Sequence, residues 1–279
     1  MAVEATMKKR CFILLFLAIV VLSSMGSATR EAVEVPLIMY HKVTKDAGQI
    51  GKFAITPAEL EADLQFIRDS EYQVVTMQAL IDFVHGHGKL PPKPLVLTFD
   101  DGYFGDYHYV YPLIWQYNIP VVSSIIGKVT DEYTAEARED IIYPHLTWPQ
   151  VEEMARSGLV EFQNHGYDIH CVRHGVAGAK RRRGESEAAY AERLEEDLNN
   201  LQHRLAEHTK TAPTTFTYPF GAKSEGTDAI IKRLGFQASL MVEGKRNMVT
   251  KGDADCLFSM GRIIRPHGRS LEQILGSAP

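Results

Sequence analysis

Two adjacent carboxylates, Asp100 and Asp101, follow directly after the apolar run of residues 95–99 and precede Gly102. The run is typical of a buried strand, and two acids at its carboxyl end are costly. Neighbouring carboxylates repel each other and stay ionised together only when a cation neutralises them. A metal ion is the simplest such cation. The pair could equally cap the helix that follows, so this segment alone leaves both interpretations open.

Two histidines, His165 and His170, flank a short turn after a second strand pattern at residues 159–163. A lone histidine at such a place is more often a loop or packing residue. Two histidines together with Asp101 supply the carboxylate and two imidazoles of a catalytic zinc-type site, which leaves coordination positions open for water and substrate. The two segments therefore predict a divalent metal ion, Zn²⁺ in the first place, with Co²⁺ or Mn²⁺ as alternatives.

A third strand pattern, at residues 214–218, runs into a turn that contains Pro219 and Gly221. Backbone amides exposed by this turn could face the metal, although an ordinary strand-to-helix turn would have the same sequence. In a barrel of alternating strands and helices, all three segments would end on the face where the carboxyl ends of the strands build the active site.

The elements that must position these residues are short apolar runs that alternate with amphipathic stretches. Several runs are continuous, as buried parallel strands are. Helix starts are expected at Thr56 and Thr147, each followed by a proline and a capping-box partner, and at Ser186, before a leucine stripe of helical spacing. Strands are expected at residues 35–43, 73–76, 95–99, 119–126, 159–163, 214–218, 236–242 and 257–264.

This alternation continues without an internal repeat or a linker rich in Pro, Gly or Ser. It predicts a single α/β domain, a β/α barrel, with an open doubly wound sheet as the alternative. The basic residues 180–183 interrupt the pattern and are interpreted as a solvated loop, with a polyanion contact as the other interpretation.

The N-terminal residues differ from the rest of the chain. Basic residues at 8–10 precede an apolar run at 11–22, and small residues follow up to Ala28. The pattern predicts a signal peptide over residues 1–28, with residues 29–279 as the catalytic domain, and a protein that is secreted or associated with the cell envelope. An uncleaved anchor is the alternative, and membrane contact is expected only in that case.

Charge and cysteine content exclude other classes of protein. The 279 residues carry 30 Lys+Arg and 35 Asp+Glu, a formal charge of −5, which argues against a general electrostatic hold on nucleic acid. The sequence contains no CxxC motif, so it gives no support for a zinc site built from thiolates. Cys171 and Cys256 lie beyond the signal, where an oxidising compartment would permit a disulfide, but the sequence does not show whether they pair.

Taken in order, these motifs resemble those of the polysaccharide deacetylase family, carbohydrate esterase family 4. Residues 98–102 are similar to its TFDDG motif, residues 165–170 to its histidine motif in a longer-spaced form, and residues 218–221 to its third motif. The opening residues 36–41 are also similar to the first strand of many members. Taken alone, the last two of these, Tyr40 and His41, are interpreted as strand residues.

The resemblance implies a deformed (β/α)7 barrel that removes N-acetyl groups from a GlcNAc-containing polysaccharide, whether peptidoglycan, a chitin-like chain or an exopolysaccharide. It implies that Asp100 is the general base, which takes a proton from the attacking water. The oxyanion or substrate would contact Tyr218 and Phe220, with the backbone N–H near Phe220 facing the oxyanion. The residues matched to metal ligands are Asp101, His165 and His170.

Three departures from the family pattern accompany the resemblance. Gly166 stands where many members have a Ser or Thr that supports the site, and Thr217 stands where many have an arginine that orients the base. A fourth motif that contains Asp and Trp is missing. The family's general acid is a histidine near the C-terminus, and His267, the only histidine after His208, is the candidate, with a loop histidine of no catalytic task as the alternative.

Other functions remain open at this point. The same chemistry would serve an amide or ester hydrolase of a small acylated molecule, and a glycan-binding barrel without turnover would keep the fold. A phosphatase built on Asp100 and Asp101 is less favoured, because that chemistry usually needs an Asp-x-Asp spacing.

Overall fold

The computed structural model describes residues 30–136, 144–173 and 175–276, and the predicted signal peptide lies outside them. From Ala32 onward the chain forms one compact unit. Among the described residues, no helix is both long and apolar enough to cross a membrane.

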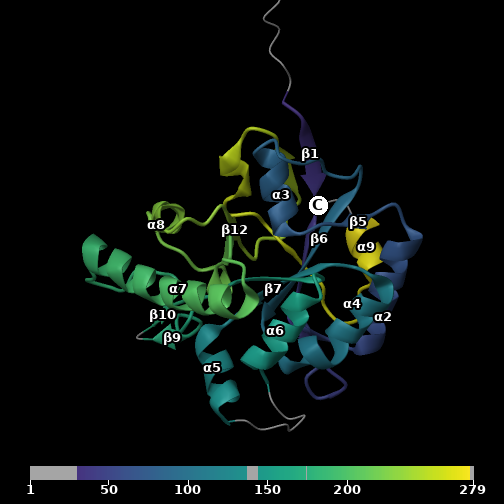
Figure 1. Cartoon of the computed structure of the whole chain (residues 1–279), viewed down its shortest axis with the longest axis horizontal. Coiled ribbons are helices and arrows are strands. Elements are labelled where there is room, and N and C mark those ends of the chain that lie inside the picture. The colour runs from purple at the N-terminus through teal and green to yellow at the C-terminus, as the bar shows by residue number, and fades with distance from the viewer. Residues whose placement is uncertain (1–29, 137–143, 174, 277–279) are drawn as a thin grey trace, which may run out of the picture. The chain divides into compact units, whose positions relative to one another are not determined.

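A curled parallel sheet lies at the centre of this unit (Figure 1). Its ends approach each other, because Leu240, in the first strand of the order below, bridges Met260, which lies close to the last strand. The prediction of a deformed (β/α)7 barrel is therefore confirmed, rather than the open doubly wound sheet. The strands, in spatial order, are β12 (Ala238–Leu240), β11 (Thr215–Thr217), β8 (Val160–Asn164), β7 (Val121–Ile125), β6 (Pro94–Asp101), β2 (Leu37–Tyr40) and β14 (Ile263–Ile264), with β5 (Gln73–Val74) beside β6.

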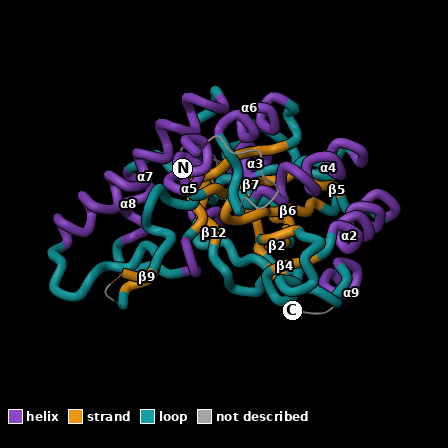
Figure 2. The backbone as a smooth tube through the Cα atoms, turned by 90° about the horizontal axis from the view of Figure 1, so that it is seen from below, coloured by secondary structure: helices purple, strands orange, loops and turns teal. Residues whose placement is uncertain are grey.

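Helices lie outside the strands, as Figure 2 shows. The three helices with predicted starts begin at those residues. The Thr56 hydroxyl accepts from the Glu59 amide at 3.1 Å, the Thr147 amide donates to Gln150 at 2.9 Å, and the Ser186 hydroxyl caps the longest helix. The helices are α2 (Pro57–Asp69), α3 (Met77–Val84), α4 (Tyr111–Tyr117), α5 (Gly127–Glu136), α6 (Trp148–Arg156), α7 (Glu187–Thr209), α8 (Thr227–Arg233) and α9 (Leu271–Gly276), with short helical turns at Asp106–Val110, Pro219–Gly221 and Ala254–Leu257.

In the described part of the chain, three small two-stranded sheets lie outside the central sheet. They are β1 (Ala32–Val35) with β13 (Asn247–Thr250), β3 (Lys42–Val43) with β4 (Ala54–Ile55), and β9 (Val172–Arg173) with β10 (Val176–Ala177).

Two predicted strands are wrong in extent. The run at 35–43 is divided. Val35 belongs to β1, outside the barrel, and only Leu37–Tyr40 forms a strand of the central sheet. The run at 257–264 is mostly turn, since Ser259 has a left-handed backbone with φ of 57°, and only Ile263–Ile264 forms a strand.

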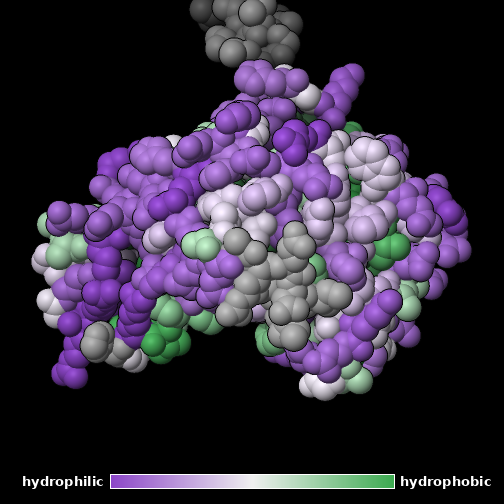
Figure 3. All heavy atoms as spheres, turned by 60° about the horizontal axis from the view of Figure 1, so that its bottom comes forward, coloured by the Kyte–Doolittle hydropathy of each residue, from purple (hydrophilic) through white to green (hydrophobic). Residues whose placement is uncertain are grey.

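The side chains outside the core are consistent with the predicted surface. On the face shown in Figure 3, hydrophilic side chains predominate and hydrophobic ones form small separate groups. The basic residues 180–183 are exposed, as expected for a solvated loop. Cys171 and Cys256 are both free, so the disulfide that the sequence permitted is not formed. The leucine stripe of α7 is fully buried, which confirms its role in packing.

Candidate metal centre and active site

The last residue of β6 has an unusual backbone. Asp101 has a φ of 74°, a left-handed conformation that costs a non-glycine residue about 1–3 kcal/mol. Gly102 follows with a φ of 66°, and a Cβ there would lie 2.7 Å from Ile125. The strand therefore turns sharply at the point where its carboxylates enter the site.

Asp101, His165 and His170 converge on one point. Asp101 Oδ1 lies 3.4 Å from His165 Nε2 and 3.2 Å from His170 Nε2, and the ligand atoms all lie within 4.8 Å of one another. Two ligands that are each about 2.0 Å from a tetrahedral ion are about 3.3 Å apart. These separations are those of three groups arranged around one ion.

The chemistry of these groups also fits a metal ion. Asp101 Oδ1 is buried, and it has no hydrogen-bond donor among the described residues, which is costly for a charged oxygen. Burial opposes ionisation of Asp101, but the neighbouring imidazoles of His165 and His170 outweigh it and lower the pKa of the carboxyl. Burial, with the charge of His165, lowers the pKa of His170 to about 4, so this imidazole is neutral and able to bind metal near neutral pH.

His165 is oriented by the neighbouring strand. Its Nδ1 lies 2.8 Å from the carbonyl oxygen of Thr217. Because a carbonyl only accepts, Nδ1 must carry the proton, and the Nε2 lone pair remains for the metal. The pairing of Phe216 with Asn164 in the sheet brings these two segments side by side.

Asp100 forms a buried, two-pronged ion pair with Arg262. Both arginine–carboxylate distances are 2.7 Å, and Arg262 has no exposed surface. Burial opposes ionisation of Asp100, but the charge and hydrogen bonds of Arg262 outweigh it and lower the pKa of the carboxyl. Arg262 is thus placed to orient Asp100, which the sequence left without an assigned partner at Thr217. A lone arginine inside the apolar run 257–264 was the one sequence signal for it.

His41, which the sequence presents as a strand residue, lies in the site. Its Nε2 is 3.9 Å from Asp100 Oδ2, and its buried Nδ1 has no hydrogen-bond partner in the described part of the chain. Burial lowers the pKa of His41, while the charges of Asp100 and Asp101 oppose that effect. Its position follows from the pairing of Tyr40 with Phe99, which places the next residues of both strands together.

His267, the candidate general acid, is not brought to this site. Its Nδ1 lies 2.8 Å from Glu59 at the start of α2, and half of its side chain is exposed. The backbone amide of His267 donates to Gly51 at 3.0 Å. These contacts hold the histidine at the N-terminus of α2, outside the set of residues that line the active-site cavity.

That cavity has a volume of about 500 Å³ and is lined by Asp100, Asp101, both histidines of the candidate metal centre and His41. Phe220 stands at its rim, 48% exposed, with a left-handed φ of 59° and its ring 4.5 Å from that of His170. Tyr218 also lines the cavity, and its hydroxyl donates to Asp228 at 2.7 Å. The other lining residues are Met39, Lys52, Phe53, Tyr103, Val242 and Ile264.

Known proteins with similar sequences are N-deacetylases. The poly-beta-1,6-N-acetyl-D-glucosamine N-deacetylase of Escherichia coli K12 is 25% identical over 254 residues, 85% of this chain and 37% of its own length. The enzyme of the same name from Staphylococcus aureus N315 is 23% identical over 219 residues, 74% of this chain and 71% of its own. The chain thus spans little more than a third of the E. coli relative.

Solved structures agree in fold. A de-N-acetylase from Aggregatibacter actinomycetemcomitans superimposes with a TM-score of 0.73 and 26% identity, over 87% of this chain and 98% of its own. IcaB from Ammonifex degensii gives 0.67 and 26%, over 84% and 92%. The family model for polysaccharide deacetylase matches residues 87–239, more than half of the chain. The family that the motifs predict is therefore confirmed, and this chain belongs to the polysaccharide deacetylases.

Proposed function

We propose that this protein is an exported, metal-dependent hydrolase that removes N-acetyl groups from a polymer of N-acetylglucosamine. The carrying observation is the cluster of Asp101, His165 and His170 beside an Asp100 that Arg262 keeps ionised. The relatives' names support a β-1,6-linked exopolysaccharide as the polymer. Residues 1–28 would be the signal that directs export, and residues 29–279 would be the catalytic domain.

The metal would be held by Asp101, His165 and His170. A divalent ion there supplies two things when bound: it lowers the pKa of a coordinated water and it polarises the amide carbonyl. The donor set, one carboxylate and two imidazoles, suits Zn²⁺ and leaves Co²⁺ or Mn²⁺ as alternatives.

The proton leaves the attacking water through Asp100. Arg262 donates a hydrogen bond to each oxygen of the Asp100 carboxylate and keeps this carboxylate ionised. Asp100 also lines the cavity. An ionised carboxylate with a fixed orientation is suited to general-base catalysis, which contributes about 10²–10⁴-fold to the rate.

The departing amine needs a proton, and we assign that donor to His41 in place of His267. His41 lines the cavity with its Nε2 3.9 Å from Asp100 Oδ2. Burial lowers its pKa on balance, and the charges of Asp100 and Asp101 oppose that effect and favour the imidazolium form. The carbon–nitrogen bond breaks as His41 donates to the nitrogen, which leaves acetate and a free amino sugar. The 3.9 Å separation from Asp100 is longer than a direct hydrogen bond, so the proton taken from water would return to His41 through a bridging water before the next turnover.

Acetate release from defined glycans tests this function directly. The exported protein, stripped with chelator and reloaded with Zn²⁺, Co²⁺ or Mn²⁺, would be incubated with β-1,6-linked GlcNAc oligomers, chitin oligomers and peptidoglycan. We expect acetate from the β-1,6-linked oligomers only after metal is restored. A fully metal-loaded protein that releases no acetate from any polymer, yet cleaves a small acylated ester, would overturn the proposal in favour of a small-molecule hydrolase.

Substitution of the ligands separates metal binding from other effects. Asp101→Ala, His165→Ala and His170→Ala should each lower bound metal and acetate release together, because each removes one of three protein ligands. Metal content would be measured by elemental analysis of the purified proteins. Stoichiometric metal at wild-type affinity in all three variants would contradict the site.

A further inference from the structure

The loop 165–170 carries both histidine ligands, and its backbone is held from two sides. On one side, the first two amides of α5, at Gly127 and Lys128, donate to loop carbonyls at 3.1 and 2.9 Å. On the other side lies α7. Because buried backbone groups need partners, these contacts determine the path of the loop.

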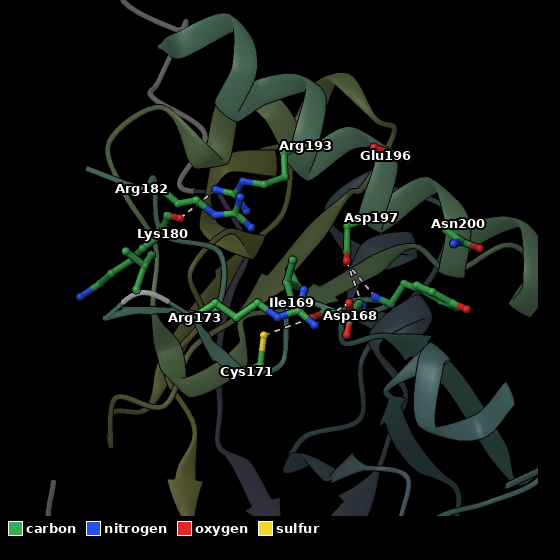
Figure 4. A pocket seen from close by; sticks show the side chains of 13 residues that line it. Asp168, Ile169, Cys171, Arg173, Lys180, Arg182, Arg193, Glu196, Asp197 and Asn200 are labelled. Atoms are coloured by element: carbon green, nitrogen blue, oxygen red, sulfur yellow. Dashed lines mark hydrogen bonds and ion pairs between the residues drawn. The ribbon is translucent and has the colours of Figure 1, made fainter. Parts of the chain in front are cut away.

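The contact from α7 is made by one side chain, Asp197. Its Oδ1 accepts from the amide of Tyr167 and its Oδ2 from the amide of Asp168, both at 2.8 Å. Figure 4 shows Asp197 pointing from α7 toward Asp168, whereas the preceding residue, Glu196, points away. A carboxylate that receives two consecutive amides fixes both the position and the direction of the chain between the two histidines.

The loop itself offers no side chain for this purpose at its first turn. Gly166 has a φ of 87°, and a Cβ at that position would lie 2.4 Å from Ile169 and 3.3 Å from Asp197 Oδ1. The restraint that a hydroxyl at this position could supply is therefore supplied from outside the loop.

The two histidines depend on the loop backbone to different degrees. His165 is buried, and the carbonyl of Thr217 fixes its ring. The side chain of His170 is 20% exposed, and its ring packs against the ring of Phe220. Asp168 lies two residues before His170, so the position of the second ligand depends on the point at which Asp197 holds the chain.

We propose that Asp197 is a positioning residue for the metal centre: by binding two amides of the loop from α7, it places His170 at its coordinating distance from Asp101. The inference rests on the metal site of the proposed function. Groups that orient metal ligands in this way typically change metal affinity 10–100-fold when they are removed.

The test measures Co²⁺ binding to metal-free protein, without any substrate. Asp197→Asn has nearly the same shape, but it presents an NH₂ group to one of the two amides. We expect Co²⁺ to bind about 10–100-fold more weakly by calorimetry, and the visible absorption bands of the bound ion to change, because they report ligand geometry. Glu196→Gln removes the same charge one residue earlier on α7 and should match wild type in both measurements.

A second variant separates geometry from charge and from folding. Asp197→Glu keeps the charge but moves the carboxylate by one methylene group, and we expect weaker Co²⁺ binding there as well. Thermal unfolding of the metal-free proteins reports any general loss of structure. A merely structural Asp197 would lower the unfolding temperature and leave the affinity and spectrum of the bound ion unchanged.

Several results would overturn the inference. Wild-type affinity and an unchanged spectrum in folded Asp197→Asn or Asp197→Glu would do so, and so would an equal loss in Glu196→Gln. Wild-type protein that binds Co²⁺ but releases no acetate would refute the proposed function and leave this inference standing. Wild-type protein that binds none of Zn²⁺, Co²⁺ and Mn²⁺ would refute both.

Discussion

Arg262 and Arg265 lie close together in the sequence, and each forms a buried ion pair with an aspartate, but the two pairs serve different regions. Arg262 binds Asp100 with both distances at 2.7 Å, and Arg265 binds Asp63 at 2.7 and 3.1 Å. All four side chains are buried. Geometry and burial of the ion pair alone would not tell which of the two belongs to an active site.

The difference lies in what else the carboxylate contacts. Asp63 also accepts from the hydroxyl of Tyr40 at 3.0 Å and from the amide of Leu271 at 3.1 Å, so its acceptor sites are filled. Asp100 keeps contact with the cavity. A carboxylate whose hydrogen-bonding capacity is used within the fold ties elements together, whereas one with an open face can take a proton.

The end of β2 divides the two regions. Tyr40 reaches Asp63, while the next residue, His41, lies 3.9 Å from Asp100. Successive side chains of a strand point to opposite faces, so neighbours in sequence serve the outer packing and the barrel interior respectively.

The largest expected effect separates the two acids. Asp100→Asn should retain metal and lose about 10²–10⁴-fold in rate, because the general base is removed. Asp63→Asn should leave the rate per folded molecule near that of wild type. Acetate release, normalised to metal content and to the folded fraction, checks both. Near-normal rates in Asp100→Asn would remove Asp100 from its role.

The arginines should differ in what their loss affects. Arg265→Met leaves Asp63 buried without its partner and should destabilise the fold by about 3–5 kcal/mol, with the rate per folded molecule unchanged. Arg262→Met should incur a similar penalty and also slow turnover, since the pKa of Asp100 would rise and the acid side of the pH–rate profile would move to higher pH. Denaturant unfolding and pH–rate profiles distinguish the two. An unshifted profile in Arg262→Met would break the comparison.

The two candidate proton donors can be compared in the same way. His41→Ala should slow amide hydrolysis by about 10²-fold, while an activated ester with a good leaving group is affected much less. His267→Ala should leave both rates unchanged, because its imidazole binds Glu59 outside the cavity. Equal losses on amide and ester in His41→Ala would indicate substrate positioning, and a selective amide loss in His267→Ala would restore the family's usual assignment.

The smallest effect concerns Glu59. Burial opposes its ionisation, but hydrogen bonds from the amides of Thr56 and Gly268 and from His267 lower its pKa to about 2. A lowered pKa stabilises the fold above the unfolded value of about 4.3, and this contribution is lost as pH falls toward 2. Glu59→Gln should therefore be about 1 kcal/mol less stable at pH 7, with a smaller difference at pH 3. A constant difference across that range would contradict the coupling.

The sequence alone was sufficient to predict the barrel and the three groups that converge in it, Asp101, His165 and His170. All three follow strand patterns, and the carboxyl ends of parallel strands meet at one edge, so their proximity follows from local signals and one topological rule. The same reasoning singled out Asp100 from its place beside Asp101.

Only the tertiary structure decided the partners of these groups. Arg262 reaches Asp100 because β14 pairs with β2, a contact between the two ends of the chain that no local pattern encodes. The pairing of β2 with β6 brings His41 beside Asp100, and the contact of His267 with Glu59 holds that histidine elsewhere, which is why we propose His41 as the proton donor. Periodicity and spacing report the environment within an element, whereas the group on which a side chain acts depends on which distant segments the fold brings together.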